Sequence, residues 1–344
     1  MPALRSLAAF VAVLLLSFLP AAARTITDSA GRVVDIPDRV ERVLAAGPPA
    51  SILVYVLAPE KLTGWVRAPK PQEKAFLLPA MRDLPAFGQL TGKGGTANIE
   101  AVLAARPDII IDVGTVNPTY ASLADKVQAQ TGIPYVLIDG AFARSGAMLR
   151  EAGAILGVEA RAETLAAYAD ETRAVLEKGL AGIPEEKRPS VYYGRGAEGL
   201  ETGLSGSINM ELLEAVGARN VAAAAGRGGL TQVSLEQVLS WKPDVILAAS
   251  PAFAGAVKDD PLWAGLDAVK AGRIHVAPGL PFGWIDSPPG INRLVGVAWL
   301  EHTLYPEAFP AALDDEVRHF FKLFYQVELS DEQLGTLLGR GAAK

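Results

Sequence analysis

The sequence predicts an α/β protein of two similar lobes, joined by a single long helix and separated by a ligand cleft. The main evidence is a repeat: residues 98–112 read NIEAVLAARPDIIID, and residues 234–248 read SLEQVLSWKPDVILA. Each copy predicts a short helix, a stop at proline, and an apolar strand of the kind found in parallel sheets covered on both faces. A repeat used only twice indicates two Rossmann-like lobes, not a solenoid.

The second observation is the stretch between the two copies. Residues 159–180 keep an amphipathic helical pattern without a break. At a rise of ~1.5 Å per residue this helix would be roughly 33 Å long, enough to cross a domain. A single helix linking two lobes is stiff, so we expect small opening and closing movements of the cleft.

The first residues predict a signal peptide. Arg5 gives a positive start, residues 7–19 are apolar, and three alanines end at Ala23. This order is typical of a cleaved export signal, so we expect the mature chain to begin at Arg24. A buried N-terminal helix is the alternative. The chain has no cysteine, so we expect neither a lipid anchor on cysteine nor disulfides.

The mature chain divides into an N-terminal lobe at residues 24–143, an interlobe helical segment at 144–184, and a C-terminal lobe at 185–344. No later segment is apolar enough to predict a membrane helix. The formal net charge is −6, and −7 without Arg5. That charge disfavours nucleic acid or an anionic membrane surface as the main partner.

In the first lobe the pattern predicts a hairpin at residues 25–36, strands at 42–46 and 62–66, a helix that opens at 52–57, and a short segment that ends at 87–89. After the repeat it predicts a further β-rich run at 134–138. The loop at 47–51, Gly-Pro-Pro-Ala-Ser, connects a strand to a helix. Such loops lie at the carboxyl ends of strands, where ligands bind in open α/β sheets, and their amides could hold an anion. An ordinary turn is the alternative.

In the second lobe the predicted strands, helices and loops follow the same order. They are a strand at 190–193, a helix at 208–216, a strand at 274–277, an aromatic Pro/Gly loop at 278–289, a helix at 291–304 and helices within 314–338. We expect the last of these to pack back on the second lobe.

Several motifs, in this order, resemble one family: the periplasmic substrate-binding proteins of ABC importers for iron-siderophores, haem and cobalamin, which have a long-helix hinge. The motifs are Ile26-Thr27-Asp28 to Gly31-Arg32, Asn98-Ile99-Glu100 to Pro107-Asp108-Ile109-Ile110, Gly132-Ile133-Pro134, and Leu212-Leu213-Glu214 to Gly217-Ala218-Arg219-Asn220. The resemblance implies a periplasmic receptor that captures a metal chelate and delivers it to a permease dimer in the inner membrane.

In that family one glutamate on each lobe docks with permease arginines, and the matching residues here are Glu100 and Glu236. Both lie in the first turn of a predicted helix, where a carboxylate also favours the helix dipole by a few tenths of a kcal/mol. Two departures concern the ligand. Residues 47–51 lack the Thr-Glu pair found in many relatives, and residues 284–293 look closer to a branch that includes receptors for molybdate and tungstate.

We expect ligand contacts from strand exits of both lobes. Aromatic rings would cover a catecholate, porphyrin or corrin, and arginines would bind an anionic chelate or oxyanion. The candidates are Pro49, Ser51, Trp65, Arg67, Tyr192, Tyr193, Arg195, Phe282, Trp284, Asp286 and Arg293. Adjacent strand residues face opposite ways, so only one of the two tyrosines can face the cleft. An Asp286–Arg293 pair is the structural alternative for those two residues.

A large aromatic cleft would favour a metal chelate, and a small amide-lined cleft near residues 47–51 would favour an oxyanion. We predict no bare metal site, because His275, His302 and His319 lie at no ligand spacing. We predict no cofactor and no enzyme activity: the nearest approach to a hydrolase elbow, at residues 203–207, ends in serine instead of glycine. A sensor or scaffold that binds a partner protein is a third possibility. We expect a monomer.

Overall fold

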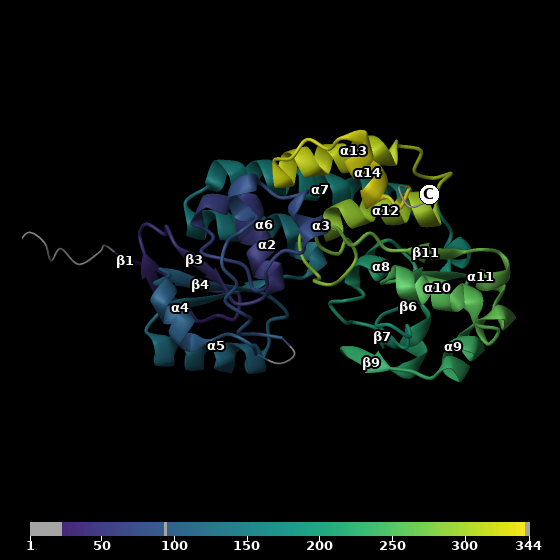
Figure 1. Cartoon of the computed structure of the whole chain (residues 1–344), viewed down its shortest axis with the longest axis horizontal. Coiled ribbons are helices and arrows are strands. Elements are labelled where there is room, and N and C mark those ends of the chain that lie inside the picture. Colours follow the sequence, from purple (N-terminus) through teal and green to yellow (C-terminus); the bar gives the residue numbers. More distant parts are fainter. Residues whose placement is uncertain (1–22, 93–94, 341–344) are drawn as a thin grey trace, which may run out of the picture.

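The computed structural model describes residues 23–92 and 95–340. Figure 1 shows two α/β lobes side by side, with helices α7 (Glu159–Ala181), α12 (Arg293–Leu304) and α13 (Leu313–Phe320) along one side of the pair. This is the two-lobed architecture that the repeat predicts. The predicted signal peptide, apart from Ala23, lies outside the described residues.

The first lobe is built on a three-stranded parallel sheet in the order β3-β4-β5. Its strands are β3 (Val43–Ala45), β4 (Ile109–Gly114) and β5 (Tyr135–Asp139), and its helices are α2 (Pro48–Leu57), α3 (Pro71–Lys74), α4 (Ile99–Ala105), α5 (Pro118–Thr131) and α6 (Ser145–Leu156).

The second lobe has a four-stranded parallel sheet in the order β11-β10-β6-β8 and a two-stranded antiparallel sheet of β7 and β9. Its strands are β6 (Ser190–Gly194), β7 (Glu201–Gly203), β8 (Arg219–Asn220), β9 (Leu230–Gln232), β10 (Val245–Ala248) and β11 (Ile274–Val276). Besides α12 and α13, its helices are α8 (Glu211–Ala215), α9 (Leu235–Trp241), α10 (Pro251–Asp259), α11 (Asp267–Lys270) and α14 (Asp331–Leu337).

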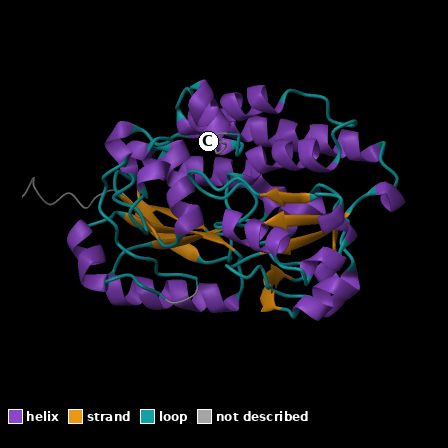
Figure 2. Cartoon of the chain, turned by 45° about the vertical axis from the view of Figure 1, so that its right-hand side comes forward, coloured by secondary structure: helices purple, strands orange, loops and turns teal. Residues whose placement is uncertain are grey.

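Both sheets are buried on two faces. Ile109 and Ile111 belong to the core that runs through both lobes, whereas Ile110 packs in a separate outer cluster of the first lobe. The alternation follows from the two-residue period of a strand, and it explains why the predicted strands are apolar at successive positions. Figure 2 shows helices on both sides of the strands.

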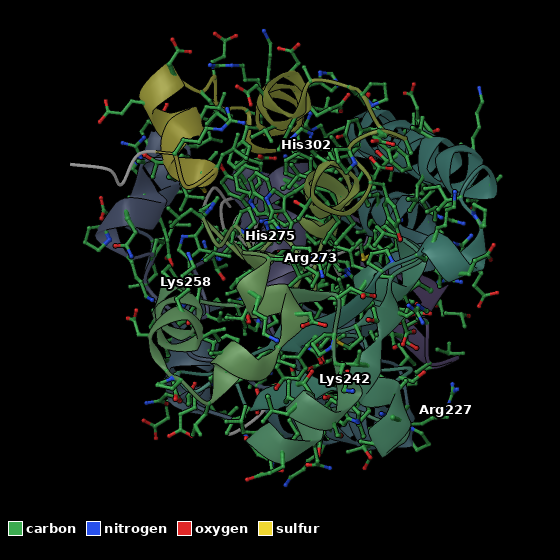
Figure 3. The ribbon with its side chains drawn as sticks, turned by 90° about the vertical axis from the view of Figure 1, so that its right-hand side faces the viewer. Arg227, Lys242, Lys258, Arg273, His275 and His302 are labelled. Carbon is green, nitrogen blue, oxygen red and sulfur yellow. The ribbon has the colours of Figure 1, made fainter. Side chains whose placement is uncertain are left out.

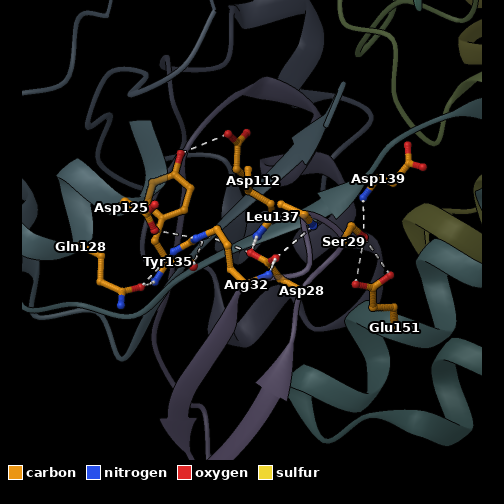
Figure 4. Close-up of polar contacts among 11 residues, drawn as sticks. Asp28, Ser29, Arg32, Asp112, Asp125, Gln128, Tyr135, Leu137, Asp139 and Glu151 are labelled. Atoms are coloured by element: carbon orange, nitrogen blue, oxygen red, sulfur yellow. Dashed lines mark hydrogen bonds and ion pairs between the residues drawn. The ribbon is translucent and has the colours of Figure 1, made fainter. Parts of the chain in front are cut away.

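The N-terminal hairpin of β1 (Ala23–Thr27) and β2 (Val33–Pro37) forms as predicted. Its turn is fastened to β5: the Asp28 carboxylate accepts from the Leu137 amide at 3.2 Å, and Arg32 donates to the Tyr135 carbonyl at 3.0 Å. The Ser29 hydroxyl accepts from the Asp139 amide at 3.0 Å (Figure 4). The hairpin is therefore an integral part of the first lobe.

The prediction of a strand at residues 62–66 is wrong. Only single bridges form there, Val43 with Leu62 and Trp65 with Ala86. The Trp65 amide donates to the Pro85 carbonyl, so this segment leaves the edge of the sheet after one residue instead of extending along β3. The apolar side chains of Leu62 and Trp65 are buried along this irregular path, so the sequence pattern of the segment resembles that of a buried strand.

The predicted interlobe helix is α7, 23 residues long, or about 34 Å. It follows α6 after Gly157, which takes the left-handed conformation that ends a helix. Arg161 ties α7 to two other segments, because its guanidinium donates to the carbonyls of Val56 in α2 and Leu323 in the tail. The exact lobe boundaries, at residues 143 and 185, stay predictions.

The C-terminal tail packs differently from the prediction, because it covers both lobes. A π-helical turn at Phe321–Tyr325 follows α13, and the Tyr325 carbonyl accepts from Tyr55 of the first lobe at 3.1 Å. The Phe321 ring lies 6.1 Å from Phe76 in the first lobe and 6.3 Å from Trp284 in the second. The tail therefore joins the two lobes beside α7.

Candidate ligand cleft between the two lobes

A cavity of about 400 Å³ opens between the lobes at the carboxyl ends of their strands. From the first lobe it is lined by Gly47, Pro48, Pro49, Gln89, Thr91, Gly92, Asp112, Val113, Gly114, Thr115, Val116, Tyr120, Leu137 and Ile138. From the second lobe it is lined by Arg195, Ile208, Asn209, Leu230, Asp286, Ser287, Pro288 and Pro289. This is where ligands bind in open α/β folds. A larger cavity, about 810 Å³, lies among α7, α12 and α13, away from the strand ends.

The loop before α2 borders the cleft as predicted, and Pro49 lines it. A side chain at Gly47 would place a Cβ 2.8 Å from the Thr91 hydroxyl, so a larger residue there would have to displace the Thr91 side chain from its present position. Pro48 and Pro49 have no N–H, and the Ser51 amide already donates to the Gly47 carbonyl. The first turn of α2 therefore offers an anion fewer amides than an ordinary helix start.

Ser51, a predicted ligand residue, does not line the cleft. It is buried within α2, and its hydroxyl donates to the Pro48 carbonyl at 2.8 Å. That bond satisfies a carbonyl in the tight Pro-Pro turn, which is a structural task.

Asp112, at the end of β4, is a cleft residue that the sequence interpretation missed. Its carboxylate accepts from the Tyr135 hydroxyl at 3.1 Å (Figure 4) and from the Thr91 hydroxyl at 3.2 Å. Burial raises the pKa of the Asp112 carboxyl above its ordinary value, although both hydrogen bonds oppose that rise. A signal for it was present: a carboxylate directly after three isoleucines of a buried strand.

Arg195 and Asp286 lie together on the second-lobe side. The guanidinium of Arg195 forms ion pairs with Glu201 and with Asp286, whose Oδ2 is 2.6 Å from Arg195 Nε. The other oxygen, Oδ1 of Asp286, accepts from Asn209 Nδ2 at 2.7 Å and from the Ser287 amide at 2.6 Å. Among the described residues that line the cleft, Arg195 is the one lysine or arginine, and two carboxylates already balance its charge.

The predicted aromatic residues are in the protein core instead of the cleft. Trp65, Phe282 and Trp284 are buried; Trp65 donates to the Met81 carbonyl, and its ring lies 5.7 Å from Phe282. Tyr192 and Tyr193 are also buried, on opposite faces of β6. Tyr120 is the one aromatic side chain among the described lining residues.

Two predicted arginines also lie outside the cleft. Arg67 is half-exposed and pairs with the carboxylate of Glu73 at 2.7 Å. Arg293 is buried and pairs with Glu211 at 3.0 Å, so the predicted Asp286–Arg293 pair is wrong. Asp286 instead pairs with Arg195 because the loop before α12 turns its side chain toward the end of β6.

Glu100 and Glu236 are exposed at the starts of α4 and α9. Figure 1 shows these helices on different lobes, on the side of the molecule away from α7. A capping Ser234 lowers the pKa of Glu236, which keeps that carboxylate ionised. Both side chains are therefore accessible charges, each at a helix start on a different lobe.

Within residues 23–92 and 95–340, no group of three or more His, Asp or Glu side chains is placed to hold a metal ion. Figure 3 shows His275 and His302 on the outer end of the second lobe, on β11 and α12. The expectation that no bare metal binds stays a prediction. In the same described part of the chain, no helix has both the length and the apolar character to cross a bilayer.

Comparison with known proteins identifies the family. Residues 61–279 match the family described as periplasmic binding protein, a span of more than half the chain. The chain belongs to the periplasmic binding protein family. Members are solute-binding proteins of ABC importers and not enzymes, in agreement with the absence of any hydrolase or dinucleotide motif from the sequence.

Several relatives of this periplasmic binding protein share most of its length. The molybdate-binding protein MolA of Haemophilus influenzae is 29% identical, over 90% of this chain and 93% of its own. Its structure bound to molybdate superposes with a TM-score of 0.72, covering 89% of this chain and 99% of that one. An ABC transporter solute binding protein from Sulfurospirillum deleyianum is 31% identical, with a TM-score of 0.83 and coverage of 92% and 99%. Helicobacter pylori CeuE, in complex with Ni-His, shares the fold at 16% identity, with a TM-score of 0.72 and coverage of 92% and 99%.

Proposed function

We propose that this periplasmic binding protein captures a small tetrahedral oxyanion of the molybdate or tungstate kind. The observation that carries the proposal is the size and lining of the interlobe cleft. Its volume of about 400 Å³ is near the low end of the ~300–1,000 Å³ range of ligand pockets. The lining includes only one aromatic ring within the described residues, so little flat apolar surface is available for a porphyrin, corrin or catecholate.

The polar groups of the cleft suit a compact anion. Arg195 supplies a planar cation, and the hydroxyls of Thr115 and Tyr120 supply donors around the same cavity. The molybdate-bound relative supports the same class of ligand.

A compact metal chelate is the second candidate, and the cleft carboxylates favour it. Asp112 and Asp286 are both buried against the cavity, where negative charge would repel a free dianion but attract a metal centre. Such a chelate must be small, because the predicted aromatic residues do not reach the cleft. A bulky ferric siderophore, haem or cobalamin is therefore less well supported than an oxyanion.

We further propose that residues 1–23 direct export to the periplasm, and that the mature chain is a monomer of lobes 24–143 and 185–344 joined through 144–184. Glu100 and Glu236 would dock with the permease dimer in the inner membrane. Their exposure at equivalent helix starts of two similar lobes supports this, because charge complementarity guides such encounters.

The test is a thermal-shift screen of the exported chain with molybdate, tungstate, sulfate, a ferric siderophore, haemin and cyanocobalamin. A ligand at one hundred times its Kd should stabilise the protein by about 2.7 kcal/mol and raise Tm clearly. We expect molybdate and tungstate to raise Tm. A rise with an iron, haem or cobalamin complex alone would replace the oxyanion with a chelate. No rise with any compound would refute the proposed oxyanion and would also exclude these three chelates as ligands.

A further inference from the structure

The ion pair between Arg195 and Asp286 is close but badly aligned. Arg195 Nε and Asp286 Oδ2 are 2.6 Å apart, yet both atoms are buried and lack a hydrogen-bond partner. At this distance the N–H bond of Nε must point away from the oxygen. The charges attract each other while a buried donor and a buried acceptor remain unsatisfied, an arrangement that proteins normally avoid.

The two partners differ in how firmly they are held. Asp286 has a fully buried side chain, and its Oδ1 is fixed by Asn209 and the Ser287 amide. Arg195 has a side chain that is 15% exposed and borders the cavity. A better acceptor entering the cleft would therefore move the arginine and leave the aspartate in place.

We propose that Asp286 is a specificity-determining residue, an internal anion that occupies Arg195 until a doubly charged ligand displaces it. This inference rests on the proposed oxyanion function. Any anion that takes the guanidinium must displace the carboxylates of Asp286 and Glu201, and that cost is the same for a monoanion and a dianion. The buried charge of Asp286 also repels the entering ligand, a dianion more than a monoanion, so this residue sets how ligand charge affects affinity, whereas cavity size selects for ligand volume.

The experiment compares wild type with Asp286→Asn by isothermal titration calorimetry at fixed ionic strength. Molybdate is the dianion, and perchlorate is a tetrahedral monoanion of similar shape. We expect wild type to bind molybdate and to discriminate strongly against perchlorate. The Asp286→Asn variant would keep an oxygen acceptor for Asn209 and Ser287 but lose the charge, so molybdate should bind about tenfold tighter, perchlorate should gain less, and the preference for molybdate over perchlorate should widen.

Two further variants keep the test decisive. Asp267→Asn removes an exposed carboxylate on α11 that pairs with Lys270, and it should change neither affinity. Glu201→Gln removes the more exposed of the two carboxylates at Arg195; it should shift affinity in the same direction by less, and it replaces Asp286→Asn if that variant does not fold.

The outcomes separate the two proposals. If wild type binds molybdate but the variants at 286 and 201 gain nothing, the inference is wrong and the proposed function stands. If neither wild type nor any variant binds an oxyanion, the proposed function fails and takes the inference with it. A tighter molybdate affinity with unchanged discrimination against perchlorate would also overturn the charge-selection role.

Discussion

At the scale of single residues, Arg293 connects the two lobes. Its buried guanidinium donates to the Gly140 carbonyl, beside β5 of the first lobe, and pairs with Glu211 of α8 in the second. Glu211 in turn accepts from the Phe142 amide at 2.8 Å, and Arg293 lies 5.6 Å from the centre of the Phe142 ring. An arginine that the sequence assigned to ligand binding therefore fastens the lobes to each other.

Replacing Arg293 with methionine should destabilise the protein by about 2–3 kcal/mol, because the Gly140 carbonyl would lose its buried donor and the partly exposed Glu211 would lose its ion-pair partner. Urea unfolding followed by circular dichroism measures this change. Arg150→Met is the matched control, since Arg150 pairs with Glu163 and Asp170 on the exposed surface and should cost at most about 1 kcal/mol. Equal losses in the two variants would contradict the role given to Arg293.

A second residue-scale prediction concerns Glu301 on α12. Burial, with a smaller contribution from Glu316, raises the pKa of Glu301 to about 7, and one of its oxygens has no partner. Between pH ~4.5 and ~7 the folded state holds a proton that the unfolded state has lost, so unfolding free energy falls as pH rises through this window. Relative to wild type, Glu301→Gln should raise the free energy of unfolding by about 1–2 kcal/mol at pH 8 and change it little at pH 4. The value at pH 8 is reduced to allow for the partial exposure of this side chain.

Urea unfolding of wild type and Glu301→Gln at a series of pH values tests this expectation. Glu171 and Glu301 both line the cavity of about 810 Å³ among α7, α12 and α13, but Glu171 is exposed. Glu171→Gln should therefore leave the pH dependence of the unfolding free energy unchanged. A constant difference between wild type and Glu301→Gln from pH 4 to pH 8 would refute the prediction.

At the scale of elements, equivalent hydrogen bonds hold the repeated helix–turn–strand unit in place in both lobes. Asn98 and Ser234 cap the helices, and the carboxylates of Asp108 and Asp244 accept from backbone amides at the start of the neighbouring strand, Arg42 at 2.8 Å and Ser190 at 2.7 Å. Each aspartate therefore fixes the position of its strand in the sheet. This is why the Pro-Asp pair recurs with the helix and the strand.

A further prediction concerns the residue before each proline of the repeat, Pro107 and Pro243. Arg106 and Lys242 end their helices with φ of 47°, a left-handed conformation that costs a residue with a Cβ about 1 kcal/mol. Arg106→Gly and Lys242→Gly should each stabilise the protein by up to about 1 kcal/mol, measured as a rise in Tm. The corresponding alanine variants keep the Cβ and should not. Stabilisation by alanine would show that side-chain charge, not backbone conformation, is responsible.

These elements also show which features of the structure could be predicted from the sequence. The repeat, the hairpin and the long helix were predictable because each depends on local signals: caps, prolines and hydrophobic periodicity. The cleft side chains were predicted less well. Arg195 and Asp286 line the cleft, but Trp65, Tyr192 and Trp284 are core residues, because an aromatic residue at a strand exit can turn inward as easily as toward ligand. Burial depends on which distant segment covers the ring, and that is a non-local property. Phe282 lies beside Trp65, Trp263 lies beside Tyr192, and Phe321 of the tail lies beside Trp284.

At the scale of the whole molecule, three of the connections between the lobes within the described residues are α7, the hydrogen bonds that join Arg293 and Glu211 to Gly140 and Phe142, and the C-terminal tail. A stiff helix supported by two further contacts leaves little freedom for a hinge. The predicted small amplitude of movement therefore follows from more than the helix alone.

Spin labels at Gln130→Cys on α5 and Gln232→Cys on β9, both exposed positions, would measure that movement, since the chain has no other cysteine. We expect one narrow distance distribution without ligand and a shift of only a few ångströms with molybdate. A broad or bimodal distribution would contradict this. The same pair in the Arg293→Met background should broaden, because one of the three connections is lost.

The tail also sets an order of events. Tyr325 and Phe321 complete the core around Tyr55 and Phe76, so the first lobe lacks part of its interior until the last residues of the chain have arrived. Domains of many proteins fold one after another as they are synthesised. The first lobe of this chain, in contrast, can complete its core only after the C-terminal tail has been synthesised. A precursor that cannot finish folding early stays available for translocation, and a fragment that lacks the tail would leave an open apolar surface on the first lobe.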